Sequence, residues 1–133
     1  MTIFALDTNT LSYLLKNDAQ VCSRMADAIH RGDDCIIPPV SYYEIKRGLL
    51  YSNATAKLNF FEGMCHAFSI GVMDMAAWNE AARLYAQTRR QGHPIEDADL
   101  FIAAFCLAGK YALVTNNTKH FEIITELSCV NWT

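Results

Sequence analysis

Short apolar runs alternate with stretches of helical periodicity along the whole chain. The runs that have the length and composition of buried strands lie at residues 3–6, 35–37, 68–73 and 112–115. The spacing of apolar residues predicts helices over about residues 8–16, 19–31, 41–50, 54–66, 75–90, 97–108 and 120–127. Residues 130–132 are expected to add an edge strand. Strands that alternate with helices predict an α/β fold around a mostly parallel sheet of four to five strands, joined by right-handed crossovers.

Polar residues mark where some of these helices begin. Asp18 has the position of an N-cap. Ser41 and Glu44 have the S-x-x-E spacing of a capping box, which predicts that Ser41 opens its helix. In the longest helical pattern, the side chains expected to face inward are those of Ala81, Ala82, Leu84 and Tyr85.

The composition is that of one folded domain. The chain has 133 residues, of which 52% are hydrophobic and 19% charged, so a single domain over residues 1–133 is expected and a disordered chain is excluded. No apolar run reaches about 18 residues, and the N-terminus lacks the features of a signal peptide. The five cysteines are widely spaced without a C-x-x-C pair, which predicts reduced thiols. These features predict a soluble, cytoplasmic protein.

Three acidic residues stand close to the expected strand ends. Asp7 directly follows the first strand, Glu44 lies in the helix after the second, and Asp99 begins a helix whose next nine residues carry no charge. Each acid alone is explained by a helix cap or by the helix dipole. In open parallel sheets, however, ligands bind outside the carboxyl ends of the strands, where the three would meet. Oxygen ligands without His or Cys favour Mg²⁺ or Mn²⁺ over zinc.

Further polar residues accompany these acids. Residues 96–99 include three carboxylates, Asp97 among them, whose mutual repulsion costs stability unless a cation relieves it. Thr115, Asn116 and Asn117 follow the last buried strand, although consecutive asparagines are also typical of a turn. No protein nucleophile is indicated, because neither Ser41 nor any cysteine has a histidine and an acid arranged around it.

Four motifs follow one another along the chain. They are Leu6-Asp7-Thr8-Asn9, Tyr43-Glu44-Ile45-x-x-Gly48, Gly92-His93-Pro94-Ile95-x-x-x-Asp99, and Val114-Thr115-Asn116-Asn117 with Phe121. In this order and spacing they resemble the PIN-domain family, and more narrowly the VapC-type ribonuclease toxins of toxin–antitoxin pairs. The resemblance runs from Ile3 to Trp132. It implies a PIN-like α/β/α sandwich and an endoribonuclease that depends on Mg²⁺ or Mn²⁺.

The resemblance also assigns roles to individual residues. The acidic metal ligands and catalytic residues that it implies are Asp7, Glu44 and Asp99. Asn117 stands where many relatives have a fourth acid, and it would act through its carbonyl oxygen or by orienting a water, without adding charge. Thr8 and Thr115 would steady the first acid or a water. The remaining supporting residues would be Asn9, Asp97 and Asn116.

Partners are implied in the same way. The resemblance predicts a homodimer, a cognate VapB-type antitoxin whose C-terminal segment covers the active site, and an RNA substrate, with tRNA favoured and initiator tRNA the first to test. The cations that lie next to the expected site and are predicted to bind RNA are Lys46, Arg47, Arg89 and Arg90. His93 and His120 are expected to be loop or RNA-facing residues, since neither has metal-ligand spacing.

The net charge of −3 at pH 7 argues at first against a nucleic-acid partner. If Asp7, Glu44, Asp97 and Asp99 share one site, removing these four from the 14 acids leaves 10 acids against 11 bases. The rest of the surface is then close to neutral. RNA recognition would therefore depend on shape and on a few well-placed Lys and Arg side chains.

Two alternatives stay open. A haloacid-dehalogenase-like phosphatase also has an acid after its first strand, but it requires a second acid where Asn9 stands and a lysine where the chain has the apolar residues 100–108. The other alternative is a PIN-like module that binds RNA or protein without cutting. It is permitted because Asn117 brings no charge to the site.

Overall fold

The computed structural model describes residues 1–133 and contains one sheet of four parallel strands in the order β2-β1-β3-β4. The strands are β1 (Ile3–Leu6), β2 (Asp34–Ile36), β3 (Ala112–Val114) and β4 (Cys129–Val130). Phe4 of β1 pairs with Cys35 on one side and with Ala112 on the other. The predicted α/β fold with a mostly parallel sheet is confirmed, with four strands that are all parallel.

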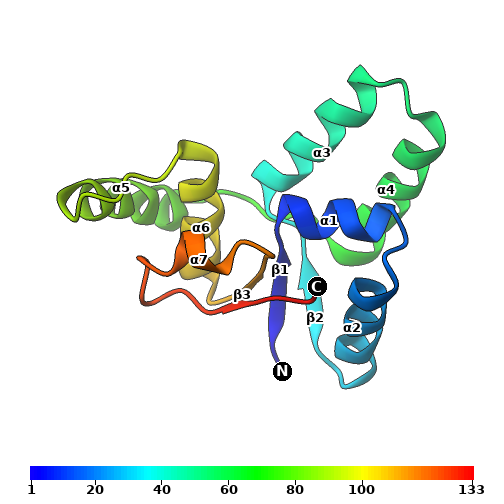
Figure 1. Cartoon of the computed structure of the whole chain (residues 1–133), viewed down its shortest axis with the longest axis horizontal. Helices are drawn as coiled ribbons and strands as arrows, with labels where there is room; N and C mark the ends of the chain where they lie inside the picture. Colours follow the sequence, from blue (N-terminus) through cyan, green and yellow to red (C-terminus); the bar gives the residue numbers. More distant parts are fainter.

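Seven helices cover the two faces of this sheet. They are α1 (Thr8–Leu15), α2 (Ala19–His30), α3 (Pro39–Tyr51), α4 (Thr55–Phe68), α5 (Met75–Arg90), α6 (Asp97–Gly109) and α7 (Thr118–Phe121). Figure 1 shows α1 to α4 on one side of the sheet and α5 to α7 on the other, with α3 and α4 projecting as a hairpin. None of these helices combines the length and apolarity that a membrane span requires.

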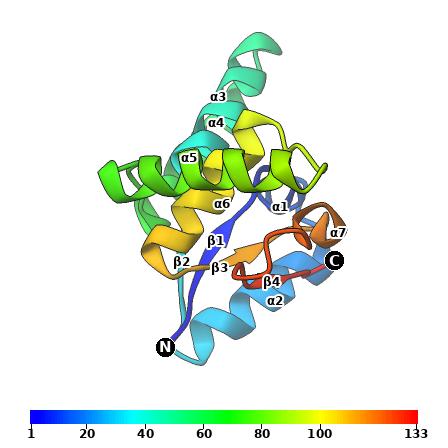
Figure 2. The same cartoon turned by 90° about the vertical axis from the view of Figure 1, so that its left-hand side faces the viewer.

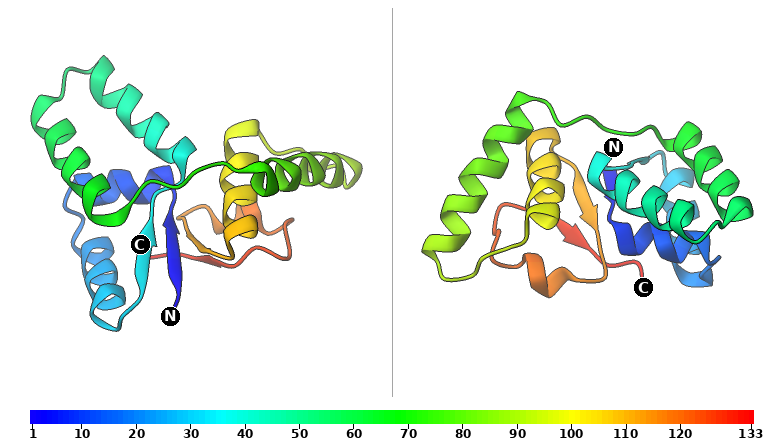
Figure 3. Two further views of the ribbon diagram at one scale, coloured as in Figure 1. Left: turned by 180° about the vertical axis from the view of Figure 1, so that it is seen from behind. Right: turned by 90° about the horizontal axis from the view of Figure 1, so that it is seen from above.

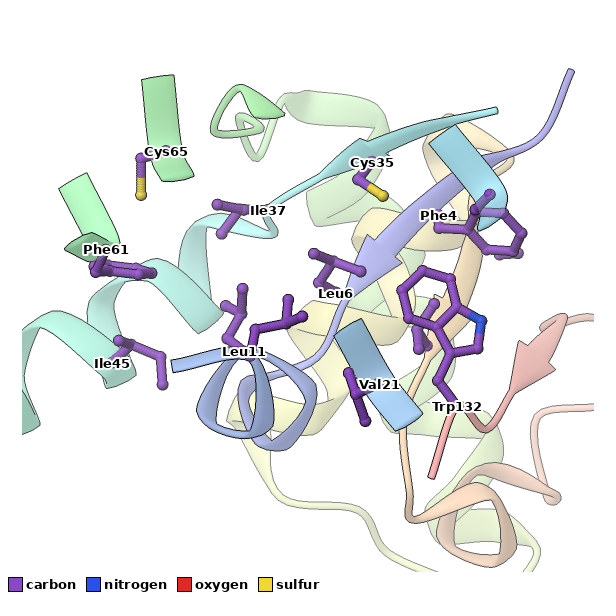
Figure 4. Packing of buried hydrophobic residues seen from close by; sticks show 14 residues of the cluster. Phe4, Leu6, Leu11, Val21, Cys35, Ile37, Ile45, Phe61, Cys65 and Trp132 are labelled. Atoms are coloured by element: carbon purple, nitrogen blue, oxygen red, sulfur yellow. The ribbon is translucent and has the colours of Figure 1, made fainter. Parts of the chain in front are cut away.

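The central strand β1 contributes side chains to two hydrophobic cores, because its side chains alternate between the two faces of the sheet. Phe4 and Leu6 belong to the core under α1 to α4, where Phe4 packs edge-on against Trp132 with ring centroids 5.3 Å apart (Figure 4). Ala5 points to the opposite face, into the core that α6 dominates. Six residues of α6 are buried, which explains why this helix is apolar on nearly all sides.

The predicted capping box at Ser41 and Glu44 is wrong. The helix begins two residues earlier, at Pro39, with Pro38 as an N-cap that has no side-chain capping bond. A proline at the first helical position loses no hydrogen bond and has the right φ, so the Pro pair opens the helix. The Ser41 hydroxyl is fully buried and has no hydrogen-bond partner.

The predicted third strand at residues 68–73 is also wrong. Helix α4 continues through Phe68, and the chain then turns at Ser69, whose φ is +67°. Only a single parallel bridge, from Ile70 to Ile37, remains of the expected strand. Ile70 and Val72 are 40% and 76% exposed, so this segment lacks the buried face that a strand of the sheet needs.

Two expectations about helices need correction as well. The helix expected over residues 120–127 is reduced to α7, and turns follow it. On α5, Ala81 and Leu84 are buried as expected, whereas Ala82 and Tyr85 are exposed. Helix α5 lies across α6 (Figure 2). The stripe of buried side chains on α5 is narrower than the apolar pattern indicates.

The unpartnered hydroxyl of Ser41 leads to a stability prediction. Ser41→Ala is expected to leave the protein as stable as the wild type or to stabilise it by up to about 1 kcal/mol, because a buried polar group without a partner is removed. The matched control is Thr10→Val, since the buried Thr10 hydroxyl donates to the Val114 carbonyl over 2.8 Å and its loss should cost about 1 kcal/mol. Urea denaturation of both variants checks this. A Ser41→Ala loss as large as that of Thr10→Val would contradict it.

Candidate active site

Asp7 lies at the junction between the central strand and the first helix. Its backbone N–H extends the ladder by donating to the Val114 carbonyl over 3.0 Å, and its side chain then caps α1, with Oδ1 accepting from the Thr8 N–H over 2.7 Å. Asp7 is only 4% exposed. The sheet therefore fixes this carboxylate in a buried position at the carboxyl edge.

The surroundings of Asp7 bring three acids into one electrostatic neighbourhood. Burial raises the pKa of Asp7 above its ordinary value, while hydrogen bonds from the Thr115 hydroxyl and the Thr8 N–H lower the pKa and partly offset burial. The negative charges of Asp99 and Glu44 raise the pKa of Asp7 further. The three acids that the sequence predicts to meet are thus within electrostatic range of one another.

Glu44 reaches this edge from α3. The Thr8 hydroxyl donates to Glu44 Oε1 over 2.7 Å, so the residue after Asp7 holds the second acid in place. The other carboxylate oxygen of Glu44 lies 3.8 Å from Arg47 Nη2. With its side chain 24% exposed, Glu44 faces both the buried Asp7 region and solvent.

Asp99 reaches the same edge from the first turn of α6. Its Oδ2 lies 3.0 Å from His120 Nε2, which must be the protonated ring nitrogen when Asp99 is ionised. Burial raises the pKa of Asp99, the contact with His120 opposes that rise, and the charges of Glu44 and Glu96 add to it. The crowding of carboxylates over residues 96–99 already indicates that Glu96 acts on Asp99. His120 has no such sequence signal, since it is 21 positions away on another element.

Asn9 and Thr115 tie the first helix to the loop after β3. Asn9 Nδ2 lies 3.4 Å from Asp7 Oδ2 and 3.5 Å from Thr115 Oγ1. Asn9 Oδ1 accepts from the Asn116 N–H over 3.2 Å, and Thr115 Oγ1 accepts from the Asn117 N–H over 3.1 Å. These contacts fix the position of Asp7 relative to the turn at Asn116 and Asn117, whose own side chains are exposed.

The side chain of Asp97 has different surroundings from that of the nearby Asp99. It is exposed and lines a hollow together with Trp78 and Tyr85 of α5. Glu96, and not Asp97, is the neighbouring acid whose charge acts on Asp99. A supporting role of Asp97 at the acidic site stays a prediction.

The cations predicted to bind RNA make different contacts with their neighbours. Lys46 Nζ lies 3.1 Å from Glu62 Oε1 and donates to the Tyr42 hydroxyl over 2.9 Å. The guanidinium of Arg47 lies 5.0 Å from the Tyr43 ring, and that of Arg89 lies 4.2 Å from the Tyr85 ring. Arg89 and its exposed neighbour Arg90 end α5, next to the loop that leads to Asp99.

The donor set at this edge has the chemistry of a hard-cation site. Asp7, Glu44 and Asp99 offer carboxylate oxygens, which Mg²⁺ and Mn²⁺ prefer. The side chains do not yet form a closed group, since no three His, Cys, Asp or Glu residues lie close enough together to hold a metal. Glu44 instead accepts from Thr8, and Asp99 contacts His120. The ligands fit a divalent cation in type, and each has a local partner that it would have to share.

A hollow of about 270 Å³ leads to this site between α1, α3 and α4. It combines the polar residues Thr8 and Glu44 at the site with the aliphatic side chains of Leu15, Ile45 and Leu49. Figure 3 shows the α3–α4 hairpin leaning over α1 on this side. An extended ligand in this hollow would bury apolar groups while it contacts Glu44.

Known proteins resemble this chain over its full length. The model of the PIN domain family matches residues 4–126. The tRNA(fMet)-specific endonuclease VapC of Shigella flexneri is 31% identical, with 99% of each chain covered. Ribonuclease VapC1 of Haemophilus influenzae strain R2866 is 26% identical, with 98% of each chain covered.

The fold agrees with these sequence relationships. The crystal structure of DNA-bound VapBC from Salmonella typhimurium contains a chain that superposes with a TM-score of 0.89 at 27% identity, covering all of both chains. The sheet and the helices described above therefore belong to a known architecture. By family match, by full-length sequence similarity and by fold, the chain is a member of the PIN-domain family, of the VapC type.

Proposed function

We propose that the chain is an endoribonuclease that hydrolyses an RNA phosphodiester bond and acts as the toxin of a toxin–antitoxin pair. The observation that carries this proposal is the buried Asp7 carboxylate at the carboxyl edge of the sheet, whose pKa is raised by the negative charges of Glu44 and Asp99. The full-length similarity to proteins named ribonuclease or endonuclease VapC supports it.

The residues that would hold Mg²⁺ or Mn²⁺ are Asp7, Glu44 and Asp99. When bound, such an ion would supply a water of lowered pKa and would stabilise negative charge on the scissile phosphate. Thr8 holds Glu44, and Thr115 holds Asp7, so both acids are oriented before substrate arrives. We assign Asn117 a neutral contribution at the same edge, through its amide oxygen.

Water is the proposed nucleophile, because neither Ser41 nor the buried cysteines Cys35 and Cys65 are suited to that role. Ser41 is fully buried and far from activation by any base, since its hydroxyl contacts no polar group. Burial raises the pKa of the Cys35 thiol to about 12 and that of Cys65 to about 11, so both stay protonated at neutral pH. Hydrolysis through an acidic site needs neither.

The proposed protein partners are an antitoxin and a second copy of the chain. An antitoxin segment that fills the hollow between α1, α3 and α4 would reach Glu44, where an arginine would pair with the carboxylates. The comparison chain of Salmonella typhimurium comes from a VapBC complex, which supports such a partner. Trp78 and Tyr85, exposed on α5, offer apolar surface for a homodimer. A toxin that acts on tRNA would work in the cytoplasm.

Initiator tRNA is the substrate we favour, because the Shigella flexneri relative is named a tRNA(fMet)-specific endonuclease. The test incubates the purified chain and Mg²⁺ or Mn²⁺ with transcribed initiator tRNA and, as a matched control, elongator methionine tRNA. We expect cleavage in the anticodon loop of the initiator to be at least about tenfold faster than cleavage of the elongator. A tenfold difference corresponds to about 1.4 kcal/mol, which one additional contact with the initiator can supply. If the chain cleaves neither these tRNAs nor any other cellular RNA, the proposed ribonuclease activity is contradicted and a PIN-like binding module is favoured.

A further inference from the structure

A third hollow, which we call the α7 pocket, lies beside the acidic site on the opposite flank from the α3–α4 hairpin. It has a volume of about 630 Å³ and lies between the loop that follows α5 and helix α7. Its lining includes His93, Pro94 and Ile95 from the loop, with Lys119, His120 and Ile123 from α7 and the following turn. Figures 2 and 3 show the loop and α7 next to each other. The volume is in the usual range of small-molecule sites, about 300–1,000 Å³.

His120 connects this pocket to the acidic site. Its ring lines the pocket, and its Nε2 lies 3.0 Å from Asp99 Oδ2. The edge of the ring is therefore shared between a proposed metal ligand and the pocket. A ligand seated in the pocket would be a direct neighbour of a phosphate at the acidic site.

The polar lining of the pocket favours an anion. Lys119 is exposed and takes part in none of the ion pairs of the structure, and His93 is exposed beside it. Glu122 is the only acid in the lining. The acidic site next to it would repel an anion, so the free cation at Lys119 marks where a second phosphate gains an attractive contact.

The loop side of the pocket presents the apolar side chains of Pro94 and Ile95 beside His93. Its backbone is fixed because the His93 N–H donates to the Thr88 carbonyl over 2.9 Å, after Gly92 has turned the chain with a φ of +75°. Ile95 is 4% exposed and forms a firm floor. Together with Pro94 and Ile123, this surface suits the face of a nucleobase, because single-stranded RNA is recognised largely by stacking of its bases on side chains.

We infer that the α7 pocket seats a nucleotide of the RNA strand adjacent to the scissile phosphate. Lys119 and His93 bind its phosphate, and the base lies over Pro94 and Ile123. His120 acts as a positioning residue that joins the pocket to Asp99. This inference rests on the proposed function, because it takes RNA to be the substrate.

The direct test uses adenosine 5′-monophosphate and NMR, and needs no cleavage. Among the four histidines of the chain, the imidazole signals of His93 and His120 are expected to shift on titration, while those of His30 and His66 stay in place. Lys119→Ala should raise the Kd about tenfold, the factor of one lost charge-assisted contact. Arg24→Ala, which removes an exposed cation on α2, should leave the Kd unchanged. Inorganic phosphate should bind more weakly.

Three outcomes would overturn the inference. They are an absence of shifts at His93 and His120, a Kd that Lys119→Ala leaves unchanged, and equal affinity for inorganic phosphate, which would remove the nucleobase from the assignment. In RNA cleavage, Lys119→Ala should raise KM and preserve kcat, because the contact is made equally in ground and transition states.

The pocket and the enzyme can fail separately. If no RNA is cleaved while the nucleotide still shifts only the imidazole signals of His93 and His120, the pocket is supported and the proposed ribonuclease activity is contradicted. If RNA is cleaved while the nucleotide leaves both histidines unchanged, the ribonuclease is retained and the pocket is lost.

Discussion

Asp7→Asn is expected to lower RNA cleavage by at least about 100-fold while the fold stays intact. Asp7 is the most enclosed of the three acids, and it holds its place through the strand ladder and the cap of α1. Asparagine keeps the shape and remains a good N-cap, so its amide oxygen still accepts from the Thr8 N–H. What the variant loses is the negative charge that would bind a divalent cation.

The thermal stability of the same variant separates lost chemistry from lost structure. Burial raises the pKa of Asp7 in the folded chain, so the folded state binds the proton more tightly than the unfolded state does. The ionised carboxylate therefore costs stability at neutral pH, and this cost disappears as pH falls through the folded-state pKa. Without added metal, Asp7→Asn should melt at or above the wild-type temperature at pH 7. This advantage should shrink in acid.

Asp33→Asn is the matched control for Asp7→Asn. The Thr2 N–H donates to Asp33 over 2.9 Å, and this hydrogen bond lowers the pKa of Asp33 instead of raising it. The control should therefore keep full RNA cleavage and melt slightly below the wild type at pH 7, with the difference fading in acid. Full cleavage by Asp7→Asn, or a collapsed circular dichroism spectrum, would remove Asp7 from the proposed role.

The parts of the fold that follow from the sequence are those where one local signal dominates. Ile3–Leu6 and Ala112–Val114 are continuous apolar runs, and both are strands of the buried sheet. Residues 68–73 show instead a loose apolar alternation that also predicts a strand, yet Phe68 ends α4, and the residues after it lie at the surface. A short alternating pattern cannot distinguish a strand from a helix end followed by an exposed loop, because that choice depends on tertiary packing.

The acidic site, like the fold, is only partly predictable from the sequence. The rule that ligands bind at the carboxyl ends of parallel strands predicts that Asp7, Glu44 and Asp99 share one edge, and the charges of the other two do act on Asp7. The hydrogen bond from Thr8 to Glu44 spans 36 positions, and its geometry depends on how α3 packs on α1. The same is true of the contact between His120 and Asp99. Which residues gather is predictable from topology, whereas which atoms pair requires the packed structure.

Removal of divalent cations is the other large effect that we expect. EDTA should stop RNA cleavage, and Mg²⁺ or Mn²⁺ in excess should restore it, because three carboxylates within electrostatic range repel one another unless a cation is bound. Chelator-resistant cleavage would contradict the acidic-site mechanism. A monovalent salt at equal ionic strength is the control, since screening alone would also weaken the repulsion.

The melting temperature gives a reading of cation binding that is independent of cleavage. A ligand at about 100 times its Kd adds about 2.7 kcal/mol to stability, which for a chain of this size raises Tm by about 5–10 °C. Asp7→Asn should abolish most of this rise, and Asp33→Asn should preserve it. Because protons compete with the cation for Asp7 and Asp99, whose pKa values burial has raised, the rise should diminish as pH falls through those values. A rise that persists in Asp7→Asn would place the cation elsewhere on the protein.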